Sequence, residues 1–82
     1  MNNIQQRIYV LESMASGIPL VTTRVGQAMD LVKHGKNGWM VDPEDAEGLV
    51  HWAKYVIYNF SNVGDVLENG RILAKENSYP AQ

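Results

Sequence analysis

Residues 11–26, LESMASGIPLVTTRVG, decide how the fold is interpreted, because they contain both a helix end and a strand start. Upstream of Gly17, apolar residues fall at helical spacing, which predicts a helix from about Ile8 to Ser16. Gly17 suits the left-handed conformation of a helix C-cap, and Pro19 prevents the helix from resuming. The β-branched run PLVTT that follows is typical of a buried parallel strand. The stretch therefore predicts a helix that turns back into a strand.

A shorter helix and a second strand follow. Apolar positions fit a helix from Ala28 to Lys33. The segment HGKNG after it has turn chemistry, since Gly35, Asn37 and Gly38 tolerate positive φ angles. The run WMV that comes next predicts a brief strand.

The segment DPEDAEGLV marks the start of a third helix. Asp42 is a suitable N-cap, and Pro43 suits the first helical position. Apolar residues then keep helical spacing as far as Phe60. Ser61 is a suitable cap for a last helix, which we expect over residues 61–77.

The order of these elements predicts the fold class. Strands that alternate with helices indicate an α/β layer with parallel strand pairing. Two strands this short cannot make a sheet that buries both of its faces. We therefore expect a piece of a larger α/β structure. We also expect fast amide exchange in the strands of the isolated chain, because a neighbouring strand is missing.

Composition excludes several classes of function. A net charge of −2 argues against a general phosphate-backbone binder, so we expect no nucleic-acid partner. The absence of cysteine excludes disulfides and thiolate chemistry. His34 and His51 are too far apart in the sequence for a standard zinc motif, so we expect no metal site. The N-terminus lacks the pattern of a signal peptide, and no apolar run could span a bilayer, so we expect a cytoplasmic location.

Three blocks occur in the chain in unbroken order: LESMASGIPLVTT, VGQAMDLV and HGKNGWMVDPEDAEGLV. The series resembles the C-terminal, nucleotide-sugar-binding domain of retaining glycosyltransferases of the two-Rossmann-domain (GT-B) type. These belong to the glycosyl transferases group 1 family, which includes sucrose synthases and bacterial polysaccharide mannosyl- and glucosyltransferases. The family pattern is roughly L-E-A-M-A-x-G-x-P-V-V-x-T, then G-G-x-x-E, then G-x-x-G. The similarity is strongest over residues 10–50. It implies that residues 1–82 are a partial Rossmann-like domain with short parallel strands flanked by helices.

The resemblance assigns nucleotide-sugar-binding roles to four residues. Glu12 matches the ribose-binding glutamate of the family, and a carboxylate offers two acceptor oxygens to a pair of vicinal hydroxyls. Amides near Ile8 and Tyr9 match the start of the helix, where the diphosphate binds. Gly26 matches a glycine loop at the edge where open α/β sheets bind ligands. Judged on composition alone, Glu12 is more simply a solvated helix residue. We expect no cofactor, because the nucleotide-diphosphate sugar is itself the donor substrate.

One departure from the family pattern lies upstream of Glu12. The family has a second glutamate that binds the donor sugar, and that position falls at Ile4, which cannot accept a hydrogen bond from a hydroxyl. A glycine of the family falls at Arg7. Either the chain has diverged, or unrelated sequence begins upstream near residues 1–7. Arg7 could help to neutralise a diphosphate or be a bystander, and we carry no sugar-binding role onto either position.

The resemblance implies transfer of a hexose from a nucleotide-diphosphate sugar to an acceptor, a glycan or a glycolipid, in polysaccharide biosynthesis. Such enzymes need an N-terminal acceptor domain, a basic pair that holds the leaving group, and usually an upstream histidine. We locate none of these here and assign no catalytic residue. We therefore expect the 82-residue chain by itself to be inactive. Peripheral membrane association through the missing part is left open.

Two other functions compete with this one. A non-catalytic interaction module, derived from a decayed glycosyltransferase domain, would explain the apolar residue at position 4. RNA binding is suggested by GKNG, which matches the G-x-x-G loop of KH domains. That loop should join two helices, whereas here a strand-like run follows it. The negative net charge also disfavours RNA.

Overall fold

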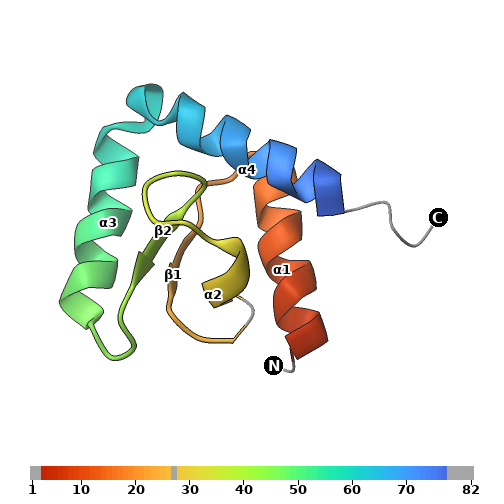
Figure 1. Cartoon of the computed structure of the whole chain (residues 1–82). Coiled ribbons are helices and arrows are strands. Elements are labelled where there is room, and N and C mark those ends of the chain that lie inside the picture. The colour runs from red at the N-terminus through yellow and green to blue at the C-terminus, as the bar shows by residue number, and fades with distance from the viewer. Residues whose placement is uncertain (1–2, 27, 78–82) are drawn as a thin grey trace.

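The structure is a computed structural model that describes residues 3–26 and 28–77. Two short strands alternate with helices along the chain (Figure 1). The elements, in order, are α1 (Asn3–Ala15), β1 (Val21–Thr23), α2 (Ala28–Leu31), β2 (Trp39–Val41), α3 (Ala46–Tyr58), the 3₁₀ turn η1 (Phe60–Asn62) and α4 (Gly64–Asn77). Within the described ranges, no helix is long and apolar enough to cross a membrane.

The two strands form a parallel pair, with Val21 opposite Trp39 and Thr23 opposite Val41. Parallel strands need a crossover connection, and α2 with its flanking loops supplies it. The expected α/β class, with short parallel strands flanked by helices, is therefore confirmed. Helices α1 and α4 pack against each other, while α3 packs on both strands. Figure 1 shows the strands between α3 and α1, with α4 crossing at one end.

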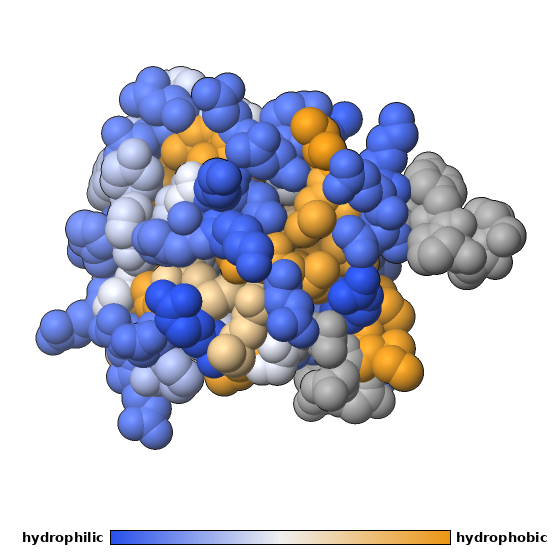
Figure 2. Space-filling model, viewed as in Figure 1, coloured by the Kyte–Doolittle hydropathy of each residue, from blue (hydrophilic) through white to orange (hydrophobic). Residues whose placement is uncertain are grey.

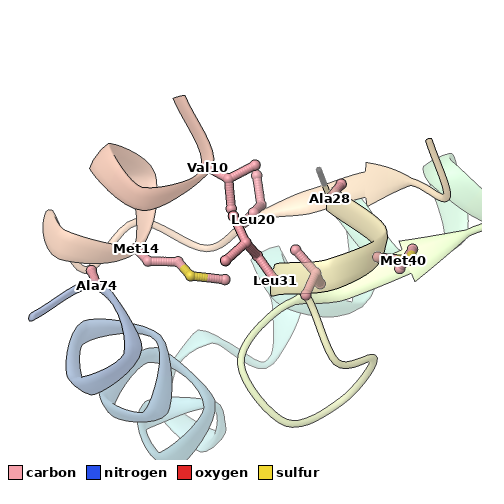
Figure 3. Packing of buried hydrophobic residues seen from close by; sticks show 8 residues of the cluster. Val10, Met14, Leu20, Ala28, Leu31, Met40 and Ala74 are labelled. Carbon is pink, nitrogen blue, oxygen red and sulfur yellow. The ribbon is translucent and has the colours of Figure 1, made fainter. Parts of the chain in front are cut away.

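Side chains of the strands alternate between two apolar clusters. Leu20 and Met40 point to the first cluster, with α1, α2 and α4. Val21 and Trp39 point to the second, with α3 and the start of α4. Figure 3 shows how side chains from α1, the strands and α2 meet in the first cluster. Its buried members are Val10, Met14, Leu20, Ala28, Leu31, Val32, Met40 and Ala74.

The end of α1 follows the prediction, but its start does not. Gly17 has φ +72° and donates its N–H to the Met14 carbonyl (3.1 Å), while Ile18 donates to the Ser13 carbonyl (3.2 Å). These two bonds make a Schellman motif, which satisfies the last carbonyls of the helix. The helix begins at Asn3, five residues before the predicted start at Ile8. The prediction rested on the spacing of apolar residues. The first turn of the helix is mostly polar and therefore gave no such signal.

Helix α3 begins later than predicted. Asp45, rather than Asp42, is the N-cap, and its carboxylate accepts a hydrogen bond from the Gly48 amide (2.9 Å). Asp42 is engaged elsewhere, because its Oδ1 accepts from Arg24 Nε at 3.0 Å. Residues 42–45 form a turn in which the Asp45 amide donates to the Asp42 carbonyl. The correct cap therefore depends on an ion pair that local sequence does not reveal.

The last helix also begins later, at Gly64 rather than Ser61. The intervening residues form η1, so the predicted range 61–77 includes a 3₁₀ turn before the α-helix. Within α4, Gly70 is buried against α1 and the turn before β2. A Cβ at this position would lie 3.3 Å from both the Asn37 carbonyl oxygen and Met14 Cγ. Gly70 thus lets α4 approach closely, which explains a glycine that weakens the helix itself.

Helix α2 ends at Leu31, two residues earlier than predicted. The Asn37 side chain binds the backbone at this end: its Oδ1 accepts from the Lys33 amide (2.8 Å), and its Nδ2 donates to the Leu31 carbonyl (3.1 Å). These bonds satisfy backbone groups that a longer helix would have paired internally. Gly35 takes the expected positive φ, whereas Asn37 and Gly38 do not.

Candidate functional site

Glu12 lies on α1 with an exposed side chain. It borders a shallow hollow of about 270 Å³ between α1 and the end of α4, lined by Ile8, Leu11, Glu12, Ala15 and Asn77. Its backbone carbonyl accepts from the Ser16 amide and hydroxyl, so the helix is well formed at this point. The carboxylate is therefore held on a rigid element and is accessible to a ligand.

Gly26 lies beside the first turns of α1. It has φ +54°, and a Cβ there would overlap Oε1 of the Gln6 side chain. The loop that follows β1 therefore packs against the N-terminal part of α1, at the carboxyl edge of the strand. This is the edge where open α/β sheets bind ligands. The structure brings Gly26 next to Gln6, on the first turn of α1.

Ile8 and Tyr9 are not at the helix start, and this part of the prediction is wrong. Because α1 begins at Asn3, their amides lie inside the helix, where they donate to carbonyls four residues earlier. The first turn, residues 3–6, carries the positive end of the helix dipole instead. The side chains of Ile8 and Tyr9 are half exposed, and that of Ile8 borders the hollow beside Glu12.

Glu12 and the helix start are separated along α1. Gln6 contacts the Gly26 loop, and Glu12 follows it six positions later, which corresponds to about 9 Å of helix rise. Arg7 bridges to α4, because its guanidinium donates to Asn77 Oδ1 at 2.8 Å. This bond links α1 to α4, the two helices that line the Glu12 hollow. Ile4, on the first turn, is 71% exposed.

A second hollow, also of about 270 Å³, lies beside the residue that follows β1 and the loop after α2. It shares no residue with the hollow at Glu12 and is lined by Arg24, Met29, Val32, Lys33, His34 and Met40. His34 is exposed, and the sequence alone assigned no role to Arg24 or Lys33. The position of Arg24 directly after a strand was the one feature that could have suggested it. Within residues 3–26 and 28–77, no three metal-ligating side chains cluster.

The aromatic residues divide between packing and exposure. Trp39 is buried, and Trp52 is half-buried with edge contacts to His34, His51 and Tyr55. Tyr58 is 81% exposed, so it does not serve as a packing residue. It is the last residue of α3.

Comparison with known proteins gives the family. The sequence profile described as "Glycosyl transferases group 1" matches residues 3–59, which include α1, both strands, α2 and α3. The chain belongs to this family. The match contains Glu12 and the Gly26 loop, whereas Asn77 of the Glu12 hollow lies outside it.

Curated relatives of this glycosyltransferase chain are much longer than the chain. A sucrose synthase from Acidithiobacillus caldus is 40% identical over 38 residues, which is 46% of this chain and 5% of that protein. An N-acetyl-alpha-D-glucosaminyl L-malate synthase from Bacillus anthracis is 35% identical over 46 residues, 56% of this chain and 12% of that protein. Sucrose-phosphate synthase 4 from Arabidopsis thaliana is 42% identical over 40 residues, 49% of this chain and 4% of that protein. No solved structure matches the chain significantly.

Proposed function

We propose that this chain is the donor-binding portion of a retaining glycosyltransferase of the GT-B type. The enzyme would transfer a hexose from a nucleotide-diphosphate sugar to a glycan or glycolipid acceptor. The single observation that carries the proposal is the family match, which spans the helix that bears Glu12. The names of the relatives, a sucrose synthase and an N-acetyl-alpha-D-glucosaminyl L-malate synthase among them, describe proteins that make sugar-containing products.

In this proposal, Glu12 binds the ribose of the nucleotide. Its carboxylate is exposed and stands on a helix fixed at its C-terminus by the Gly17 cap. Two carboxylate oxygens can each accept a hydrogen bond from one of two vicinal hydroxyls, and charge-assisted bonds of this kind are the stronger ones. The adjoining hollow, partly apolar through Ile8 and Leu11, offers a surface beside the sugar ring.

The diphosphate is assigned to the first turn of α1. A thirteen-residue helix presents the positive end of its dipole at this turn. Gly26 packs there against the Gln6 side chain, which occupies the space where a Cβ at position 26 would lie. The role first given to the amides of Ile8 and Tyr9 therefore passes to residues 3–6.

The test is nucleotide binding by the full-length protein that contains this chain. Uridine, guanosine and adenosine diphosphates are titrated by calorimetry into wild type, Glu12→Ala and the control Glu47→Ala, which removes an exposed acid from α3. We expect wild type and Glu47→Ala to bind one of them equally well. Glu12→Ala should bind about tenfold more weakly or worse, since a charge-assisted hydrogen bond contributes roughly 1.5–3 kcal/mol. Unchanged affinity in Glu12→Ala would remove Glu12 from the site.

The alternative is a non-catalytic interaction module built on a decayed copy of the domain. Ile4 favours it, because an apolar side chain that is 71% exposed stands where the family pattern has an acid. The same titration separates the two functions. If none of the three nucleotides binds to the full-length protein, the module is supported and the donor role fails.

A further inference from the structure

The second hollow gathers three cationic or hydrogen-bond-donating side chains from different segments. Arg24 directly follows β1, Lys33 and His34 come from the loop after α2, and Met40 of β2 also lines the hollow. We propose that this hollow is a binding site for a phosphate-type oxyanion. The site shares no residue with the proposed donor site and does not depend on that proposal.

The His34 ring is held by a backbone hydrogen bond that determines which ring nitrogen can donate to a ligand. Its Nδ1 accepts a hydrogen bond from the Met40 amide at 3.0 Å. An imidazole nitrogen that accepts carries no proton, so the neutral ring has its proton on Nε2. The ring also makes an edge contact with Trp52, with ring centroids 4.9 Å apart. Both contacts restrict the ring, so that Nε2–H remains as its one donor for a ligand.

Arg24 is held from two directions. Its Nε donates to Asp42 Oδ1 at 3.0 Å, and its Nη1 lies 3.6 Å from the Met40 sulfur. The guanidinium has five N–H donors, and these two contacts leave others for a ligand. Asp42 neutralises part of the charge, but its side chain is 75% exposed and does not line the hollow. Arginine suits oxyanions because its planar fork can bind two oxygens together.

Lys33 adds a second cation, and it lies on a loop that is held by hydrogen bonds. The Asn37 side chain binds the Lys33 amide and the Leu31 carbonyl, and Gly35 donates to the Gly38 carbonyl (2.8 Å). These bonds fix the loop that carries Lys33 and His34.

Charge and size define the class of ligand. Arg24 and Lys33 supply two cations and His34 a further donor, and no acid is among the described residues that line the hollow, which favours an anion with several acceptor oxygens. A volume of about 270 Å³ lies at the lower end of the range for small-molecule sites and suits a phosphate group rather than a whole nucleotide. The remaining lining, Met29, Val32 and Met40, is apolar and can cover the rest of a phosphorylated molecule.

The test is a titration of the ¹⁵N-labelled protein with inorganic phosphate, at constant ionic strength set with sodium chloride. The Met40 amide and the Arg24 Nε–H report directly on the site, because both groups contact its lining. We expect saturable shifts of these two signals. Lys33→Met should bind phosphate about three- to fivefold more weakly, as befits one exposed ionic contact. The control Lys75→Met removes the same charge from the last turn of α4 and should bind as wild type does.

Two further arms identify the source of the phosphate. A hexose 1-phosphate represents a soluble phosphate ester, and phosphatidylcholine vesicles that contain phosphatidic acid represent a lipid headgroup. Binding in either arm that weakens in Lys33→Met but not in Lys75→Met supports the site and names its source. The proposal is overturned if no arm gives saturable shifts, or if the two lysine variants weaken binding equally. Equal weakening would mean that only net charge matters.

Discussion

Gly17 shows how much a single residue contributes to this fold. Its φ of +72° lies in the region that L-residues with a Cβ avoid, and the Schellman bonds of α1 depend on it. Sequence alone identified this turn, because the left-handed requirement is local. The need for glycine at positions 26 and 70 could not be predicted from the local sequence. It arises from contacts with Gln6 and Asn37, which lie far away in the sequence.

We predict that Gly17→Ala lowers the free energy of unfolding by about 1 kcal/mol, because alanine is strained at this φ. Gly64→Ala is the matched control. It stands at the first position of α4 with open space around its Cβ, and a less flexible unfolded chain should stabilise it by about 0.4–1 kcal/mol. Urea unfolding followed by circular dichroism measures both. Equal loss in the two variants would contradict the role of the turn.

The start of α3 illustrates what determines an element boundary. Both Asp42 and Asp45 are good caps by type, and Pro43 made Asp42 the better choice in the sequence. Arg24, eighteen residues away, binds Asp42, and Glu44 takes a positive φ of 70° in the turn between the two acids. The helix therefore begins where Asp45 can reach the Gly48 amide.

We predict that Asp45→Ala lowers the free energy of unfolding by about 1 kcal/mol, the usual cost of losing an N-cap. Asp42→Ala should cost less, because it removes only an exposed ion pair, which contributes about 0–1 kcal/mol. Thermal unfolding of the two variants side by side gives the comparison. A larger loss in Asp42→Ala would show that the cap is at the position first predicted.

The strand pair gives a second prediction for an element. Trp39 donates to the Leu20 carbonyl and Arg24 donates to the Val41 carbonyl, so the residues directly before and after β1 bond to β2. The amides of Val21 and Thr23 then face the opposite edge. Hydrogen exchange should be faster at Val21 and Thr23 than at Thr22. Equal protection would mean that the outer edge of β1 is covered in solution.

The whole molecule is stabilised by two clusters on opposite faces of a two-stranded sheet. Val10 belongs to the cluster with α1 and α4, and Val56 belongs to the cluster with α3. Because a strand pair this small serves both clusters, neither can persist without the other. Apolar side chains also run along the outer side of α1, visible on the face in Figure 2. Among them, Ile4 and Ile8 are at least half exposed.

We predict one cooperative unfolding transition for both faces. Val10→Ala and Val56→Ala should each lower the free energy of unfolding by about 2 kcal/mol, from lost burial plus the cavity left behind. Val50→Ala, on an exposed position of α3, is the control and should change it little. Tryptophan fluorescence reports the α3 side, and far-ultraviolet circular dichroism reports the helices. Separate midpoints for the two probes in wild type would contradict the shared core.

The sequence by itself determined the order of the elements, the turn at Gly17, the buried strand Trp39–Val41 and the family. These features depend on neighbours within a few residues or on a series of short motifs. Only the tertiary structure decided that Asp45 caps α3 and that Gly70 lets α1 and α4 pack closely. It also decided that Arg24, Lys33 and His34 line one hollow. Each of these depends on groups that are distant in the chain, and only folding brings such groups into contact.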